Sequence, residues 1–373
     1  LDWRGRVAWP AGMGGVDLSA LAIDRLNVTG RVALHDGASR TTLELEDIAF
    51  AGDVRALAGA LRGEGNASIN GVRYPFRISS NPAGTGDGVR LRLVVASGAG
   101  ALNADLDGVL RFAASVPQFD GALTLERPAP RAAASDALPW RIATKVKADP
   151  AAARFEQIEL GYGPDDAALK LAGHADMRFG ASPQLNATLA GRQLNADRLL
   201  ARGDGDVAQV LPALQRFVAA LPSAPLPIDV AVSAEVVTLG GRPVQEPSVT
   251  LRGDTAGWSL DRLAGVLPGA TQVAIRDAIL RAGSEQAFSG TVDIAANDPD
   301  ALITWLRGRS DPAVRLTQPL RASGRVSVDS SRVAIEDLKA SVEGDSVSGR
   351  VVLSGRDSAQ GAHLDAALTA PRL

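Results

Sequence analysis

The chain has 373 residues, of which 46% are hydrophobic and only 4% are aromatic, and its formal net charge at pH 7 is −3. This balance argues against a nucleic-acid surface, which needs cationic and stacking side chains. The absence of cysteine excludes disulfides, thiolate metal sites and a cysteine nucleophile. No run approaches the roughly 20 apolar residues of a membrane-spanning helix. Because the chain begins without Met, we expect a fragment whose targeting signals lie outside it.

The first predicted segment, residues 1–127, alternates apolar and polar residues with a period of two. Such alternation is typical of strands with one buried face. The runs include "IDRLNVTGRVALHD", "GVRLRLVV" and "GALTLE", and residues that favour turns separate them. We therefore expect an N-terminal β-meander that ends at the linker "ERPAPRAAASDALP" near residues 126–139.

The second predicted segment, residues 128–221, is a β-repeat that ends in helical sequence. Its strands give way to "NADRLLA", which predicts a short helix, and then to "DVAQVLPALQRFVAALP" from Asp206, whose apolar residues share one helical face. The Pro-rich stretch "LPSAPLP" at 221–227 closes the segment.

The third predicted segment, residues 222–373, contains β-repeats and a short helix at 298–307. In "FSGTVDIAANDPDALITWLRG" a strand pattern runs directly into a helix pattern. Asp298 suits the N-cap and Pro299 the first helical position. We expect Trp305 and Leu306 to pack over the end of a group of strands and terminate it. The alternative is that Trp305 projects over the apolar face as a plug or gate.

A degenerate repeat links the segments. An Ile/Leu-Glu pair recurs at Leu45-Glu46, Ile158-Glu159 and Ile335-Glu336, and each is followed by an acidic turn, as at Gly52-Asp53. Recurrence of one β-meander unit predicts an array in which each unit contacts its neighbours.

Residues for chemistry are sparse. The only histidines are His35, His174 and His363, and each stands alone in strand-like sequence. No spacing typical of metal ligands or of a nucleophile with its base is present. We therefore expect a protein that is not an enzyme and has no cofactor or metal.

The apolar face of the strands is the candidate functional surface. Medium-sized aliphatic residues occupy one side, and Ser, Thr, Arg or Asp occupy the other. The candidate lining residues are Val273, Ile275, Phe288, Val292, Ile294, Val326, Val328, Val347, Val351 and Leu353. Two such faces closed on each other would make a sandwich. A long curled sheet would instead leave the face open, and the many Ala and Gly residues suit strong curvature.

Four stretches together resemble the repeats of the AsmA family of Gram-negative envelope proteins. They are "ARFEQIELGYGPDDAALKLAGHADMRFGASPQLNATLAGRQLNADRLL", "VTLGGRPVQEPSVTLRGDTAGWSLDRLAGVLPGATQVAI", "FSGTVDIAANDPDALITWLRG" and "RVAIEDLKASVEGDSVSGRVVLSG". The resemblance implies a periplasmic protein anchored in the inner membrane by an N-terminal helix, which this chain lacks. It also implies a mainly β fold, an elongated, curled antiparallel β-groove of meander repeats with a few short capping helices, like that of bridge-like lipid-transfer proteins.

The resemblance implies a role in outer-membrane biogenesis. The expected ligand is phospholipid or another acyl lipid carried along the groove between the inner and outer membranes, with membrane contact through regions outside this chain. The alternative is a scaffold for outer-membrane β-barrel proteins that regulates their targeting without lipid transport. Nucleic acid is not an expected partner.

Overall fold

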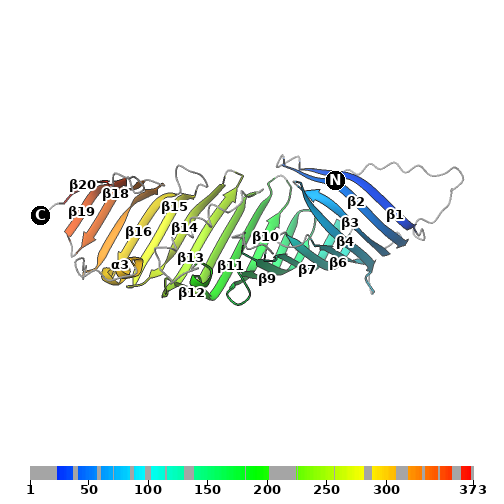
Figure 1. Ribbon diagram of the computed structural model, residues 1–373, viewed down its shortest axis with the longest axis horizontal. Coiled ribbons are helices and arrows are strands. Elements are labelled where there is room, and N and C mark those ends of the chain that lie inside the picture. The colour runs from blue at the N-terminus through cyan, green and yellow to red at the C-terminus, as the bar shows by residue number, and fades with distance from the viewer. Residues whose placement is uncertain are drawn as a thin grey trace.

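The computed structural model describes most of the chain. The described residues are 23–36, 41–56, 60–69, 71–84, 88–96, 102–113, 116–129, 138–180, 182–200, 224, 226–255, 257–280, 288–307, 318–329, 332–342, 345–354 and 363–370. They form one elongated sheet of 20 strands with two short helices along it (Figure 1). The predicted fold class, a mainly β, curled meander, is confirmed.

The strands of the N-terminal half are 8 to 16 residues long. They are β1 (Ile23–Asp36), β2 (Thr41–Ala56), β3 (Ala60–Ile69), β4 (Val72–Pro82), β5 (Gly88–Val95), β6 (Asn103–Ala113), β7 (Val116–Arg127), β8 (Trp140–Ala148), β9 (Ala152–Tyr162), β10 (Leu169–Arg178) and β11 (Gln184–Asn195). The four-residue helix α1 (Asp197–Leu200) follows at the position that "NADRLLA" predicts.

The C-terminal half continues the same pattern. Its elements are β12 (Ile228–Leu239), β13 (Arg242–Asp254), β14 (Gly257–Leu267), β15 (Thr271–Leu280), β16 (Phe288–Ala296), α3 (Pro299–Arg307), β17 (Leu320–Val328), β18 (Arg332–Val342), β19 (Asp345–Ser354) and β20 (His363–Thr369). The helix expected from Asp206 lies outside the described residues.

Each strand pairs with the next one in the chain, from β1 through to β20. All of these pairings are antiparallel except β11 with β12, which run parallel. The sheet therefore advances one strand at a time, and β1 and β20 lie at its two ends (Figure 1). It runs without interruption through both predicted segment boundaries.

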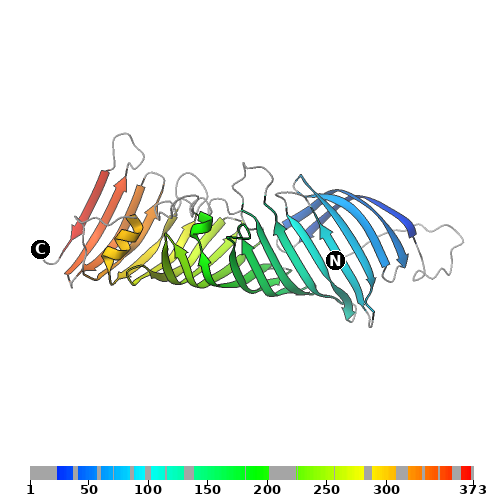
Figure 2. The ribbon, with the colours of Figure 1, turned by 60° about the horizontal axis from the view of Figure 1, so that its bottom comes forward.

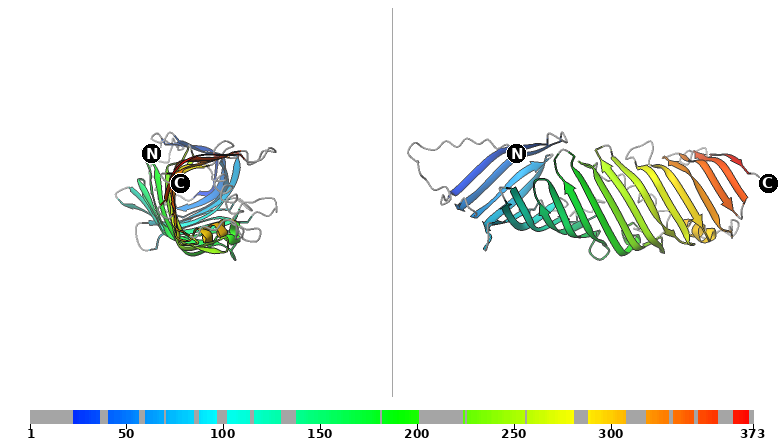
Figure 3. Two further views of the ribbon diagram at one scale, coloured as in Figure 1. Left: turned by 90° about the vertical axis from the view of Figure 1, so that its left-hand side faces the viewer. Right: turned by 180° about the vertical axis from the view of Figure 1, so that it is seen from behind.

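Bulges bend the strands. Six described residues other than glycine have positive φ. One of them, Ala270, lies in the turn between β14 and β15. The other five lie where the strand register shifts: Asp47, Gln157, Glu246, Asp277 and Asp337. A bulge inserts one residue into a strand, bends it and increases its right-handed twist. The sheet accordingly follows a curve when seen along its length (Figure 3, left).

In the sequence repeat, the Ile/Leu-Glu pair is followed by a bulge residue. Asp47 and Asp337 directly follow Leu45-Glu46 and Ile335-Glu336, as predicted for equivalent positions. In the middle copy the bulge is at Gln157, so its equivalent pair is Phe155-Glu156, and the alignment on Ile158-Glu159 was wrong by three residues. The turn expected at Gly52-Asp53 was also wrong, because both residues lie inside β2, where they pair with β3.

The sheet is a single layer. The chain exposes 24351 Å², whereas a compact protein of its 38.5 kDa mass would expose roughly 14,000 Å². All described strands belong to this one sheet, so no second sheet among them closes its apolar side into a sandwich. Both helices lie near one long edge (Figure 2).

Candidate functional site: an apolar face along the sheet

The strand pairing brings the ten predicted lining residues onto one side of the sheet, here called the apolar face. In antiparallel strands, directly opposite residues point to the same side. Val273 lies opposite Ile294, Ile275 opposite Val292, and Phe288 opposite Val328. Strand β18 pairs with both β17 and β19, and this pairing places the other four predicted residues on the same side: Val326, Val347, Val351 and Leu353.

The β18 residues that complete this face were missing from the predicted set. Ile335 lies between Val326 and Val351, and Val333 lies between Val328 and Leu353. The signal that would have found them is the alternation at the start of "RVAIEDLKASV", where Val333 and Ile335 are two residues apart. The apolar face is therefore continuous across β15 to β20.

The same face continues through the N-terminal half. Opposite pairs there include Phe76 with Val95, Leu93 with Leu106, and Leu123 with Leu106. Further pairs lead on through β8 to β12: Ile142 with Leu160, Leu171 with Leu160, Gly173 with Leu189, and Leu189 with Val232. Between the strand ends of β4 to β20, the pairing places no charged residue on this side of the described strands.

Two hydroxyl groups on this face, those of Ser80 and Thr144, are hydrogen-bonded to the backbone. Ser80 accepts a hydrogen bond from the Leu61 N–H at 3.1 Å, and Thr144 donates one to the Glu156 carbonyl at 2.9 Å. Both side chains are buried. Neither hydroxyl therefore interrupts the apolar surface as a free polar group.

Aromatic rings on the face lie flat over glycines of the same or a neighbouring strand. Phe50 and Phe76 are stacked, with ring centroids 6.2 Å apart and planes 4° apart. A Cβ added at Gly63 or Gly65 would meet one of these rings. The same arrangement recurs with Phe119 over Gly108 and Gly121 and with Trp258 over Gly253. Because the glycines provide the space, large rings add apolar area without standing up from the sheet.

Among the described residues, only helix α3 lies over part of the face. All ten predicted lining residues are half-buried, as expected for side chains that touch their strand neighbours and are still reached by solvent. Toward the C-terminal end Leu364 and Leu368 are 63% and 52% exposed. A contiguous apolar surface of this length marks a site for an apolar ligand or a partner.

Helix α3 packs on one edge of the apolar face. Trp305 and Leu302 form a buried cluster with Val244 and Ala296, and Ile294 packs against it. Since Ile294 belongs to the apolar face and α3 lies within the curve in the end-on view (Figure 3), the apolar face is the inner one. Trp305 also donates a hydrogen bond from Nε1 to the Leu239 carbonyl at 2.9 Å.

The ends of α3 follow from its sequence. Asp298 accepts a hydrogen bond from the Ala301 N–H at 3.0 Å, which is N-cap geometry, and Pro299 is buried at the first helical position. The burial expected for Leu306 was wrong, because this side chain is 48% exposed. Leu306 is one helical turn after the buried Leu302, and the helix ends one residue later, at Arg307.

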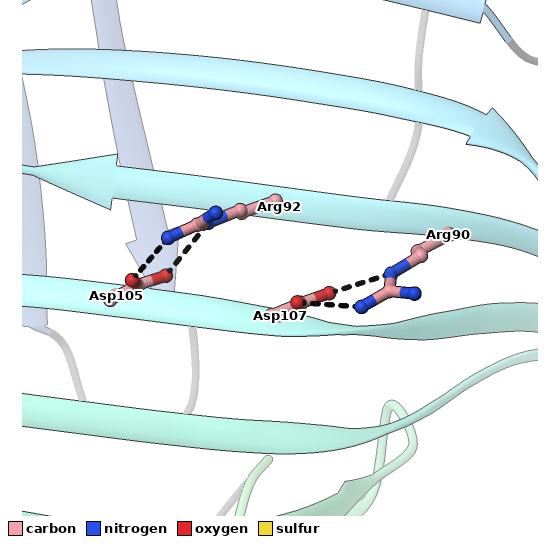
Figure 4. Close-up of polar contacts among 4 residues, drawn as sticks. All are labelled: Arg90, Arg92, Asp105 and Asp107. Carbon is pink, nitrogen blue, oxygen red and sulfur yellow. Dashed lines mark hydrogen bonds and ion pairs between the residues drawn. The ribbon is translucent and has the colours of Figure 1, made fainter.

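Ion pairs organise the opposite side, here called the polar face. Arg90 and Arg92 of β5 each hold a carboxylate of β6 with two hydrogen bonds: Arg90 to Asp107 at 3.0 and 2.9 Å, and Arg92 to Asp105 at 3.3 and 2.8 Å (Figure 4). The hydrogen bonds from Arg90 lower the pKa of Asp107. Such pairs across neighbouring strands help to fix the register.

Sites for catalysis or metal binding are not apparent in the described part of the chain. No group of three or more His, Cys, Asp or Glu residues there is arranged to hold a metal ion. His174 and His363 are exposed on separate strands, and the His35 side chain lies outside the described set. None of the described helices is long and apolar enough to span a membrane.

Comparison with known proteins adds no relative. No family model matches the chain. No curated protein and no solved structure matches it either.

Proposed function

We propose that this chain carries phospholipid or another acyl lipid along its apolar face. The observation that supports the proposal is the uninterrupted, uncharged apolar surface that the strand pairing builds from β4 to β20, which among the described elements only α3 covers in part. Each methylene that leaves water for such a surface gains about 0.8 kcal/mol. An acyl chain on this surface therefore avoids most of the cost of being exposed to water outside a membrane, while the headgroup stays in solvent.

The geometry also suits movement along the sheet. With strands roughly 4.8 Å apart, the 20 strands span on the order of 90 Å. Aliphatic residues recur at each step and no charge intervenes, so successive positions offer a sliding acyl chain similar free energies. The flat aromatic rings over glycines keep the surface low where larger side chains occur.

The setting we propose is the periplasm of a Gram-negative envelope. The AsmA-like repeat pattern supports it, and so does an elongated sheet of the kind that pattern implies. In this proposal the chain is the periplasmic body of an inner-membrane protein whose anchor lies in a segment outside it, and lipid moves between the inner and outer membranes during outer-membrane biogenesis.

Site-specific crosslinking tests the proposal. A photoreactive amino acid is placed at Val292, on the apolar face, or at Asp293, the next residue on the polar face. In cells grown with labelled phospholipid precursors, we expect crosslinks to lipid from position 292 and few from 293. Equal labelling at both positions, or none at 292, would rule out lipid carriage on this face.

A second candidate function uses the edge of β20. This strand pairs with β19 alone among the described strands, and all seven of its residues are exposed. An exposed edge can add a strand of a partner through main-chain hydrogen bonds. A scaffold for outer-membrane β-barrel proteins would give protein crosslinks from Asp365 or Ala367, in place of lipid crosslinks from Val292.

A further inference from the structure

The polar face has a hollow of its own in the C-terminal half, which lipid carriage does not use. It has a volume of about 950 Å³ and crosses seven strands, β13 to β19. At roughly 4.8 Å per strand, it extends on the order of 30 Å. Small residues, including Ala264, Ala274 and Ala295, line its floor. A chain-like ligand laid across the strands can therefore come close to the sheet.

The hollow has an excess of positive charge. Arg262, Arg321 and Lys339 line it, and none of them has an ion-pair partner among the described residues. Of the two carboxylates that line it, Asp293 is already paired with Arg276, which leaves Glu246. The arrangement differs from β5 and β6, where each arginine holds an aspartate (Figure 4).

Serine hydroxyl groups lie next to two of these cations. The strand register places Arg321 opposite Ser341 and places Lys339 between Ser323 and Ser348. Directly opposite side chains have Cβ atoms about 5 Å apart, so a single anionic group can contact a cation and a hydroxyl together. Guanidinium, ammonium and hydroxyl donors are the usual partners of phosphate oxygens.

We propose that this hollow binds a phosphate-bearing glycan chain. The cations lie on β14, β17 and β18, so a ligand that contacts all of them needs several anionic groups along its length. The serine hydroxyls can form hydrogen bonds with the sugar hydroxyls that separate those anionic groups. None of its lining residues is aromatic, which disfavours single-stranded nucleic acid because bases bind by stacking. The hollow lies on the face opposite the lipid surface, so glycan and lipid bind without competing.

Binding to phosphomannan tests the proposal, with dephosphorylated mannan, polyglutamate and single-stranded DNA as comparison ligands. We expect the wild-type chain to bind phosphomannan, to lose affinity as salt increases, and to bind the other three at least tenfold more weakly. The variant R321Q/K339Q should weaken phosphomannan binding by roughly tenfold or more, because two charge-assisted contacts are lost.

The matched control is R141Q/K145Q, which removes one arginine and one lysine from exposed positions of β8 outside the hollow. It should bind within about twofold of wild type, and thermal melting should show that both variants fold. Ser348→Glu is a second probe, since the new carboxylate faces Lys339 and competes with the ligand. Equal losses in the control, tighter binding of DNA or polyglutamate, or no phosphomannan binding would each overturn the proposal.

Discussion

Replacing Trp305 by alanine should destabilise the edge of the sheet that α3 covers. The indole is 7% exposed and packs against Val244, Ala296 and Leu302. A buried tryptophan removes roughly 150–250 Å² from water, which is worth about 4–6 kcal/mol at about 25 cal/mol per Å². Because alanine keeps part of that burial, the truncation costs roughly 3–5 kcal/mol. The Leu239 carbonyl also loses its hydrogen-bond donor, which adds about 1 kcal/mol.

Chemical denaturation gives the free energy of unfolding, and hydrogen exchange at the turn between β12 and β13 shows whether the loss is local. Leu306→Ala is the matched control, because this leucine is on the same helix but is 48% exposed; it should cost less than about 0.5 kcal/mol. If Trp305→Ala cost under about 1 kcal/mol while changing the amount of bound lipid, Trp305 would be a gate over the apolar face and the packing argument would be refuted.

Three further predictions follow from local geometry. Asp298→Ala should lower the free energy of unfolding by about 1 kcal/mol, measured by denaturation, because α3 loses its N-cap. Gly121→Ala should cost about 1–3 kcal/mol in the same assay, because the new Cβ would lie 2.6 Å from the backbone Cα of Gly108 and 2.8 Å from Cζ of Phe119. Asp107 has a lowered pKa in the folded chain, so its stabilisation is present above about pH 4 and is lost as the pH falls through the folded value. Thermal melts from pH 7 to pH 2 should show a smaller acid destabilisation for Asp107→Asn than for wild type.

The strands and the apolar face could be predicted from the sequence because both depend on local alternation. Once neighbouring strands pair in order, residues two apart in one strand share a face, so Phe288, Val292 and Ile294 were identifiable without any knowledge of contacts. The cap of α3 was equally local, since Asp298 and Pro299 act on the turn that follows them.

What could not be predicted depends on register and on distance along the chain. A bulge shifts the direction of the following side chains by one residue. The strand pairing shows that the bulge residue Gln157 is equivalent to Asp337, whereas the sequence alone aligned Ile158-Glu159 with Ile335-Glu336. The burial of Trp305 and the exposure of Leu306 depend on where β12 ends, over 60 residues earlier. The hollow on the polar face combines residues from seven strands, which no local pattern reveals.

The most direct test of lipid carriage compares two adjacent valines of β19. Val351 lies opposite Ile335 on the apolar face, whereas Val352 lies opposite Ala334 on the polar face, and both are half-buried. Val351→Asp and Val352→Asp introduce the same charge into the same strand. After gentle purification and confirmation of folding by circular dichroism, mass spectrometry measures the phospholipid retained per protein. We predict severalfold less lipid with Val351→Asp and near wild-type lipid with Val352→Asp; equal retention by both variants, or no lipid on the wild-type chain, would contradict the account.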